Sequence, residues 1–151
     1  MKAIVQRIAR GSVTADGHPA GRAGNGLLIL LGVVEGDTAE QAQLLAAKCA
    51  KLRIFCDEND KMNRSVLDMD GDILVVSNFT LAADVRKGNR PSFTGAAAPD
   101  AAQALYEQFC AELRTLGVKS VETGEFGADM QIDMVADGPV TILMDTDIWT
   151  R

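Results

Sequence analysis

The chain has 151 residues, a formal net charge of −6 and 47% apolar residues, which indicate one ordinary globular domain. The net charge would normally argue against nucleic acid as a partner, and we expect no DNA partner. No apolar run reaches the ~18 residues of a membrane span, and the first segment lacks the apolar core of a signal peptide. We therefore expect a cytoplasmic protein that does not enter a membrane. Three cysteines without C-x-x-C spacing and a single histidine argue against a disulfide framework and a bound metal.

The first third of the chain predicts strands separated by turns. Residues 2–8 alternate between apolar and polar side chains, and a second short strand is expected over Ser12–Ala15, before a turn at Asp16-Gly17. Residues 18–26 contain a proline, three glycines and an asparagine, which predict a loop. The nearly continuous apolar run Leu27–Val34 predicts a buried strand.

Two helices are predicted further along. Thr38 and Gln41 match the capping-box pattern, in which each side chain bonds a free backbone N–H group of the other residue. Apolar residues at helical spacing follow: Ala42, Leu45, Ala46, Cys49 and Leu52. Pro99 suits the start of a second helix and Gly117 its end. The inner face expected for this helix consists of Ala102, Leu105, Phe109, Leu113 and Leu116.

Strands are predicted between and after the helices. Ile73–Val76 indicates a buried strand, and alternating apolar residues over 130–134 indicate another. A turn at residues 136–139 then leads into a strand over Val140–Met144. This order predicts a single α/β domain over residues 1–151, with layered sheets and helices against one face.

The negative charge is concentrated near the carboxyl end. Residues 122–151 sum to −6, whereas residues 1–121 sum to zero. Two small basic patches remain as candidate phosphate contacts, with ordinary solvated side chains as the alternative. They comprise Lys2, Arg7, Arg10 and Arg22 near the start, and Arg86, Lys87 and Arg90 in the middle.

The sequence offers little to standard catalytic devices. A Ser-His-Asp or Cys-His device needs a histidine beside the nucleophile, and His18 lies in the predicted glycine-rich loop. Neither the GxxxxGK[ST] nor the GxGxxG phosphate loop occurs. If the chain is an enzyme, this composition predicts that it works without a cofactor. An ester is a suitable substrate, because backbone N–H donors alone can stabilise its tetrahedral oxyanion. Each such donor contributes roughly 10²–10³ in rate.

Two segments resemble motifs of the D-aminoacyl-tRNA deacylase family. Ser77–Ala83 resembles the S-Q-F-T-L motif, and Asp137–Thr141 resembles the second motif, N-x-G-P-V-T. Other family-like segments occur in the same order over nearly the whole chain, among them Phe126–Met130. The chain departs from the pattern at Asn78, where most members have glutamine, and at Ala136, where they have asparagine.

The resemblance implies a layered β/β/α fold, a homodimer with its active site at the subunit interface, and hydrolysis of the ester between a D-amino acid and the 3′ end of tRNA. A cis Gly138-Pro139 dipeptide would reach into the partner's pocket, where its carbonyls accept the substrate ammonium and exclude L side chains. The resemblance assigns the ester and adenosine site to Ser77, Asn78, Phe79 and Thr80. Further substrate contacts are expected from Met130, Arg7 and Gln6.

No histidine is available to activate Thr80, so backbone donors around residues 78–80, assisted by the 2′-hydroxyl of the terminal ribose, fit better than a threonine nucleophile. Three other interpretations stay open. The chain could be a non-catalytic module that binds tRNA ends, a related deacylase acting on mischarged L-aminoacyl-tRNA, or a structural dimerisation domain.

Overall fold

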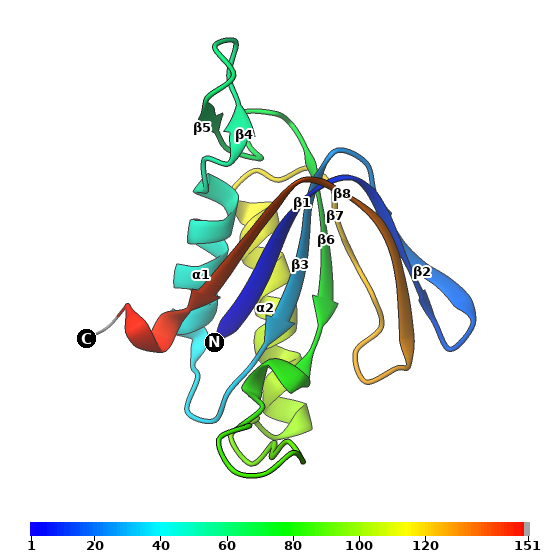
Figure 1. Ribbon diagram of the computed structural model, residues 1–151, viewed down its shortest axis with the longest axis vertical. Coiled ribbons are helices and arrows are strands. Elements are labelled where there is room, and N and C mark those ends of the chain that lie inside the picture. Colours follow the sequence, from blue (N-terminus) through cyan, green and yellow to red (C-terminus); the bar gives the residue numbers. More distant parts are fainter. Residues whose placement is uncertain (150–151) are drawn as a thin grey trace.

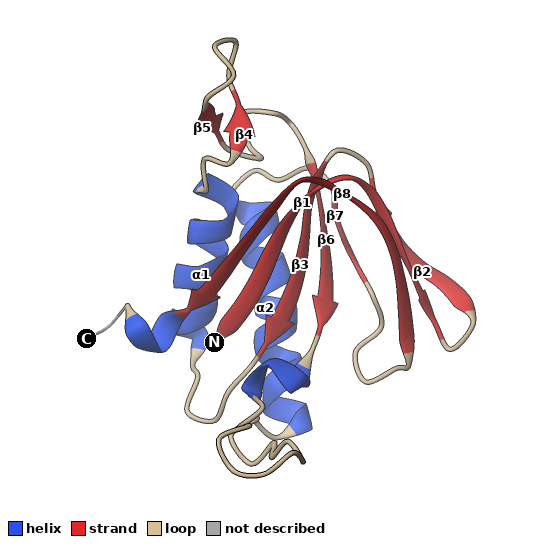
Figure 2. Cartoon of the chain, viewed as in Figure 1, coloured by secondary structure: helices blue, strands red, loops and turns tan. Residues whose placement is uncertain are grey.

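A curled six-stranded sheet forms the centre of the molecule, and two helices cover one of its faces (Figure 1, Figure 2). The computed structural model describes residues 1–149. The strand order is β2-β1-β3-β6-β7, and β8 pairs with the other edge of β1. This arrangement confirms the predicted α/β fold with layered sheets and helices on one side.

The elements differ in detail from those predicted. The sheet strands are β1 (Lys2–Ala15), β2 (His18–Ala23), β3 (Gly26–Gly32), β6 (Asp72–Ser77), β7 (Val121–Thr123) and β8 (Met130–Asp145). The helices are α1 (Ala39–Lys51) and α2 (Pro99–Thr115), with 3₁₀ turns η1 (Phe79–Ala82) and η2 (Thr146–Ile148). A separate hairpin of β4 (Phe55–Cys56) and β5 (Met62–Arg64) projects from the top of the view in Figure 1.

The core beneath the helices follows from the two-residue period of apolar side chains in the strands and their 3.6-residue period in the helices. Alternate residues such as Ala3, Val5 and Ile29 point from the sheet towards α1 and α2, and all three are fully buried. The predicted capping box at Thr38 is present, and Gly117 follows α2 at a φ of 107°. Each fully buried Leu, Ile or Phe in this layer contributes about 1.5–3 kcal/mol. Neither described helix is long and apolar enough to cross a membrane.

β1 is one strand rather than two. Its first half pairs with β3 and its second half with β2 on the same edge, while β8 follows the other edge. The second half therefore curls over the face away from the helices. A smaller core lies beneath this curl and consists of Ile8, Val13, Ala23, Leu28, Leu74 and Val76.

The prediction of a loop over residues 18–26 was wrong, because most of that segment is β2. Its glycines serve close packing. A Cβ at Gly21 would collide with the backbone carbonyl of Thr123, and one at Gly26 with the backbone of Asp72. These glycines allow neighbouring strands to approach, which sequence alone does not distinguish from turn formation.

The predicted turn at 136–139 was also wrong. β8 continues through it, with the extra residues forming a bulge opposite Arg7. The pairing passes from Gln6–Thr141 to Ile8–Ala136. The cis Gly138-Pro139 peptide bond lies in this bulge.

The amino group of Met1 lies in the core with a charged partner. It bonds Asp37 Oδ1 and Thr146 Oγ1, each at 2.7 Å, and the Asp37 side chain is only 3% exposed. Asp37 Oδ2 also accepts the Val34 N–H at 2.8 Å. This group of bonds joins the start of β1, the end of β8 and the segment before α1.

We expect Asp37→Asn to lower the free energy of unfolding by about 3–5 kcal/mol, because it leaves a buried ammonium without its counter-charge. Asp70→Asn is the matched control. Asp70 pairs with Lys119 at 3.1 Å, but the two side chains are 65% and 78% exposed, so its loss should cost under about 1 kcal/mol. Urea denaturation measures both values, and equal losses in the two variants would contradict the expectation.

Candidate active site

A cavity of about 760 Å³ opens at the carboxyl ends of β3 and β6. Its walls come from four places: the strand ends, η1, the first half of α2, and the segment that enters β8. The residues lining these walls include Leu31, Ser77, Asn78, Phe79, Thr80, Ala97, Tyr106, Phe126, Asp129 and Met130. The predicted residues Ser77, Asn78, Phe79, Thr80 and Met130 are therefore brought together by the fold.

The Ser77–Thr80 segment lines the cavity and contains backbone donors that have no acceptor within its turn. β6 ends at Ser77, and the Asn78 N–H is held by the Leu31 carbonyl at 2.8 Å. Phe79 and Thr80 are the first residues of η1, so helical geometry gives their N–H groups no acceptor within the turn. The Thr80 hydroxyl donates to Asn78 Oδ1. Asparagine is one methylene shorter than the glutamine that most family members have at this position. The Asn78 side chain thus bonds its own turn instead of reaching across the site.

Phe79 lies at the rim of the cavity, since it is 60% exposed. Its ring meets Phe93 edge to face, with centroids 5.2 Å apart. The two phenyl rings form an apolar surface on which a planar base can stack. This exposure shows that Phe79 is not a core residue.

Tyr106 and Phe126 form the deep wall, and sequence reasoning did not assign either to the site. Their rings lie 5.8 Å apart, and the Tyr106 hydroxyl donates to the Val75 carbonyl at 3.0 Å. Burial raises the pKa of Tyr106 well above its usual range, so the phenol stays protonated and does not serve as a base. The helical pattern pointed to Leu105, whereas Tyr106 is the buried neighbour.

Asp129 is the only carboxylate among the residues that line the cavity. Its backbone is fixed by Asp16 at the β1–β2 turn. The Asp16 N–H donates to the Asp129 carbonyl at 2.8 Å, and Asp16 Oδ1 accepts the Asp129 N–H at 3.2 Å. The curl of the sheet therefore supports the wall that carries Met130.

The second motif lies elsewhere and is held by Arg7. The Arg7 guanidinium donates to the Asp137 carbonyl at 3.1 Å and to the Ile54 carbonyl at 2.8 Å. A Cβ on Gly138 would lie 2.8 Å from the Val140 nitrogen and 3.2 Å from the Arg7 guanidinium. Gln6 is beside this bulge, with its amide 3.4 Å from the Thr141 hydroxyl. Arg7 and Gln6 thus position the bulge and do not line the cavity of their own chain.

The two motifs lie at opposite ends of the sheet. Gln6 and Thr141 are level with Leu74 of β6, three residues before Ser77. The three residues from Leu74 to Ser77 separate Thr141 from the level of Ser77 by about 10 Å along the strands. The three strand spacings from β8 to β6 add a separation of about 14 Å across the sheet. Gly138 and Pro139 lie further still from Ser77. One chain therefore does not bring its own Gly-Pro bulge to its own cavity.

His18 lies exposed at the start of β2 and is not among the residues that line the cavity. The sequence contains no other histidine, so no imidazole lies beside Thr80 within one chain. Within residues 1–149, no three histidine, cysteine, aspartate or glutamate side chains are grouped as metal ligands.

The order and geometry of the motifs agree with comparisons to known proteins. A family profile described as D-Tyr-tRNA(Tyr) deacylase matches residues 4–145. The chain belongs to the D-aminoacyl-tRNA deacylase family. A Paracoccus denitrificans protein named D-aminoacyl-tRNA deacylase is 57% identical over 146 residues, covering 97% of each chain. One of the same name from Roseiflexus castenholzii is 55% identical, covering 99% of this chain and 94% of its own.

Two solved structures have the same fold. One, titled c-Myc DNA Unwinding Element Binding Protein, has a TM-score of 0.90 and 40% identity, covering 96% of this chain and 98% of its own. The other is described as a probable eukaryotic D-amino acid tRNA deacylase. It has a TM-score of 0.77 and 20% identity, covering 95% of this chain and 97% of its own. At that identity the second structure supports the deacylase fold alone.

Proposed function

We propose that the cavity binds the 3′-terminal aminoacyl-adenosine of D-aminoacyl-tRNA and that the chain hydrolyses its ester. The observation that carries this proposal is that Phe79 and Thr80, whose N–H groups have no acceptor within η1, line a largely apolar cavity. Such a site stabilises an oxyanion without an ionisable nucleophile. Membership of the D-aminoacyl-tRNA deacylase family supplies the substrate class.

Hydrolysis in this site uses few protein groups. A water adds to the ester carbonyl carbon, and the N–H groups of Phe79 and Thr80 bond the oxyanion that forms. Collapse of this intermediate breaks the bond to the ribose 3′-oxygen, which takes a proton relayed through the neighbouring 2′-hydroxyl. The products are free D-amino acid and tRNA. The Thr80 hydroxyl orders the turn through Asn78 and does not attack the ester.

The chirality of the substrate is read by the second motif acting in trans. Gly138 and Pro139 of the partner subunit supply carbonyls that accept the α-ammonium group. These carbonyls occupy the space that an L side chain needs, so D-amino acids and glycine enter. The distance between the motifs within one chain supports this arrangement, because the bulge is remote from its own cavity.

A homodimer through the uncovered face of the sheet brings the two motifs together. Leu143 of β8 is 73% exposed and lies directly opposite Ile4 of β1 on that face. Ile132 and Val135 of the same strand are 40% and 37% exposed. A strand with this many exposed apolar side chains is typical of a surface covered by another subunit.

The test of function is release of amino acid from D-Tyr-tRNA, L-Tyr-tRNA and Gly-tRNA after exhaustive chelation, with Mg²⁺ added back to fold the tRNA. We expect hydrolysis of the D and glycyl esters alone. Binding without turnover would instead identify a tRNA-end module, and release from L-Tyr-tRNA alone an L-specific deacylase. Activity restored only by Zn²⁺ would contradict the cofactor-free site. We also propose a cytoplasmic location and a role in proofreading the chirality of amino acids during translation.

Thr80→Ala should lower the rate by roughly 10-fold, the scale of one lost neutral hydrogen bond. Loss of a true triad serine costs about 10⁶-fold in kcat. Thr80→Ser is the control, because it keeps the hydroxyl that donates to Asn78. Single-turnover deacylation of D-Tyr-tRNA measures both variants, and a fall of the triad size with a trapped acyl-threonine would show that Thr80 is the nucleophile.

Subunit complementation tests the shared site. Thr80→Trp fills the mouth of the cavity, and Gly138→Val places side-chain atoms against Val140 and Arg7. Each homodimer should be inactive. Unfolding and refolding an equal mixture should restore about a quarter of the wild-type rate, because half of the dimers then contain one intact site out of two. No recovery, with heterodimers shown by mass spectrometry, would place both motifs in the same chain's site.

A further inference from the structure

The segment between η1 and α2 carries a cluster of exposed cations, which we call the basic loop (residues 84–92). Residues 73–99 contain Arg86, Lys87 and Arg90 but a single carboxylate, Asp84, so their formal charge is +2. An antiparallel bridge closes the loop. The Asp84 N–H donates to the Ser92 carbonyl at 2.7 Å, and the Ser92 N–H to the Asp84 carbonyl at 3.0 Å.

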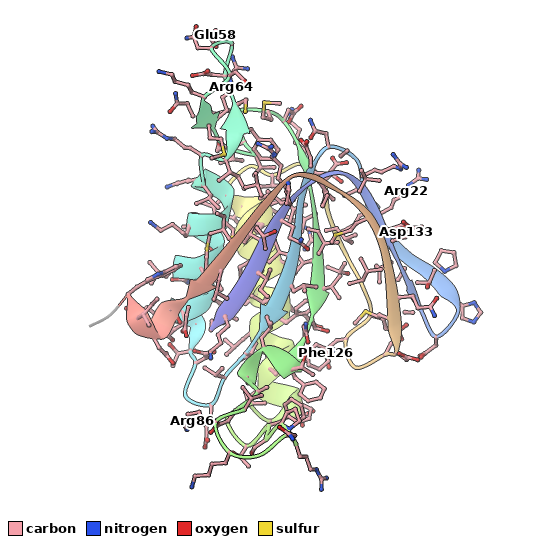
Figure 3. All side chains as sticks on the ribbon, viewed as in Figure 1. Arg22, Glu58, Arg64, Arg86, Phe126 and Asp133 are labelled. Atoms are coloured by element: carbon pink, nitrogen blue, oxygen red, sulfur yellow. The ribbon has the colours of Figure 1, made fainter. Side chains whose placement is uncertain are left out.

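The basic loop is held beside the mouth of the cavity. Phe93, which directly follows it, contacts the ring of Phe79 on the rim, and Ala96 and Ala97 then line the wall. Figure 3 shows Arg86 at the lower end of the molecule, at the end opposite the β4–β5 hairpin that carries Glu58 and Arg64. An RNA strand that crosses the basic loop therefore reaches the cavity over the two phenylalanine rings.

The cations of the loop are available to a ligand. Arg86 bonds Asp84 through two nitrogens at 2.9 and 2.7 Å, and this pair stiffens the base of the loop. Lys87 and Arg90 are exposed and have no ion-pair partner among residues 1–149. Gly88, at a φ of 66°, turns the chain between them.

The side of the cavity opposite the basic loop repels such a ligand. Residues 120–149 contain no lysine or arginine, and the segment on the other side of the cavity exposes Glu125, Asp129 and Asp133. Two cations of the basic patch near the start of the chain are paired with the same acidic segment. Lys2 lies 3.8 Å from Asp145, and Arg7 lies 3.4 Å from Asp137.

We propose that the basic loop binds the phosphates of the tRNA acceptor end and that the strand approaches the cavity only from this side. The proposal rests on the proposed function of the cavity. Lys87 and Arg90 contact successive phosphates, while carboxylates on the opposite rim exclude the backbone by like-charge repulsion. A net charge of −6 is compatible with RNA binding here, because the basic loop places two exposed cations without an ion-pair partner among residues 1–149 beside the mouth of the cavity.

The test variant is Lys87→Glu/Arg90→Glu, which leaves the Asp84–Arg86 pair and the phenylalanine contact intact. Lys51→Glu/Lys61→Glu is the control, with the same charge change at two exposed lysines that have no ion-pair partner among residues 1–149. Lys51 ends α1, and Lys61 lies in the β4–β5 hairpin at the end of the molecule opposite the basic loop (Figure 3). Two substrates are compared: D-Tyr-tRNA, and the D-tyrosyl ester of adenosine, which has no phosphate.

We expect the test variant to lower kcat/KM for D-Tyr-tRNA by roughly 10- to 50-fold at low salt and to reduce the salt slope by about 1 to 1.5. Its kcat/KM for the adenosine ester should equal that of wild type, and the control should match wild type on both substrates. Equal losses on both substrates, or an unchanged rate on tRNA, would overturn the proposal.

A binding measurement separates this proposal from the proposed function. Fluorescence anisotropy of an uncharged acceptor-stem minihelix with a CCA end should show the same loss for the test variant alone. If wild type hydrolyses neither substrate yet binds the minihelix through the basic loop, only the proposed activity fails. Equal binding and equal loss with duplex DNA of the same length would overturn recognition of the RNA end.

Discussion

The backbone ladder between β1 and β8 determines where each part of the site lies. It runs from the pair Lys2–Asp145 to the pair Ala15–Met130, so β8 is aligned along nearly the whole of β1. One end of this ladder delivers Met130 to the cavity wall. The bulge opposite Arg7 lies near the middle of the ladder, between the pairs Gln6–Thr141 and Ile8–Ala136. The first motif follows β6 and the second lies in β8, and both strands belong to the same sheet, so no small motion within one chain closes the distance between them.

That ladder also leaves β8 poorly covered. Residues 131–139 are exposed apart from the half-buried Met134, although the strand contains Ile132 and Val135. A strand paired on one edge and uncovered on its faces gains little from apolar burial. A second copy of the chain over this region would bury these side chains and carry the Gly138-Pro139 bulge to a foreign cavity. Stability and site assembly would then have the same physical origin.

Much of the fold was predictable because the helices and buried strands have clear periodicity. The capping box at Thr38 and the boundaries at Pro99 and Gly117 were confirmed. β2 was missed because glycine at position 21 serves close contact with Thr123, which involves residues a hundred positions apart in the sequence. β8 was divided in two because a Gly-Pro pair normally ends a strand, whereas a bulge absorbs it here.

The site was predictable to the extent that local sequence encodes it. Ser77–Thr80 was found by its motif, but the deep wall of Tyr106 and Phe126 depends on how α2 packs against β6, which no local pattern reports. The same packing explains why so sparse a site is adequate. Tyr106 is protonated and its hydroxyl already donates to the Val75 carbonyl, so the side chain shapes the cavity wall and excludes water but takes no part in acid–base chemistry. In a cavity of low polarity, backbone dipoles act more strongly on a developing oxyanion than they do in water. Under the proposed function an ester demands little more than this. Selection of the substrate would then fall to rigid backbone at an interface, and approach of the RNA to charge on one rim.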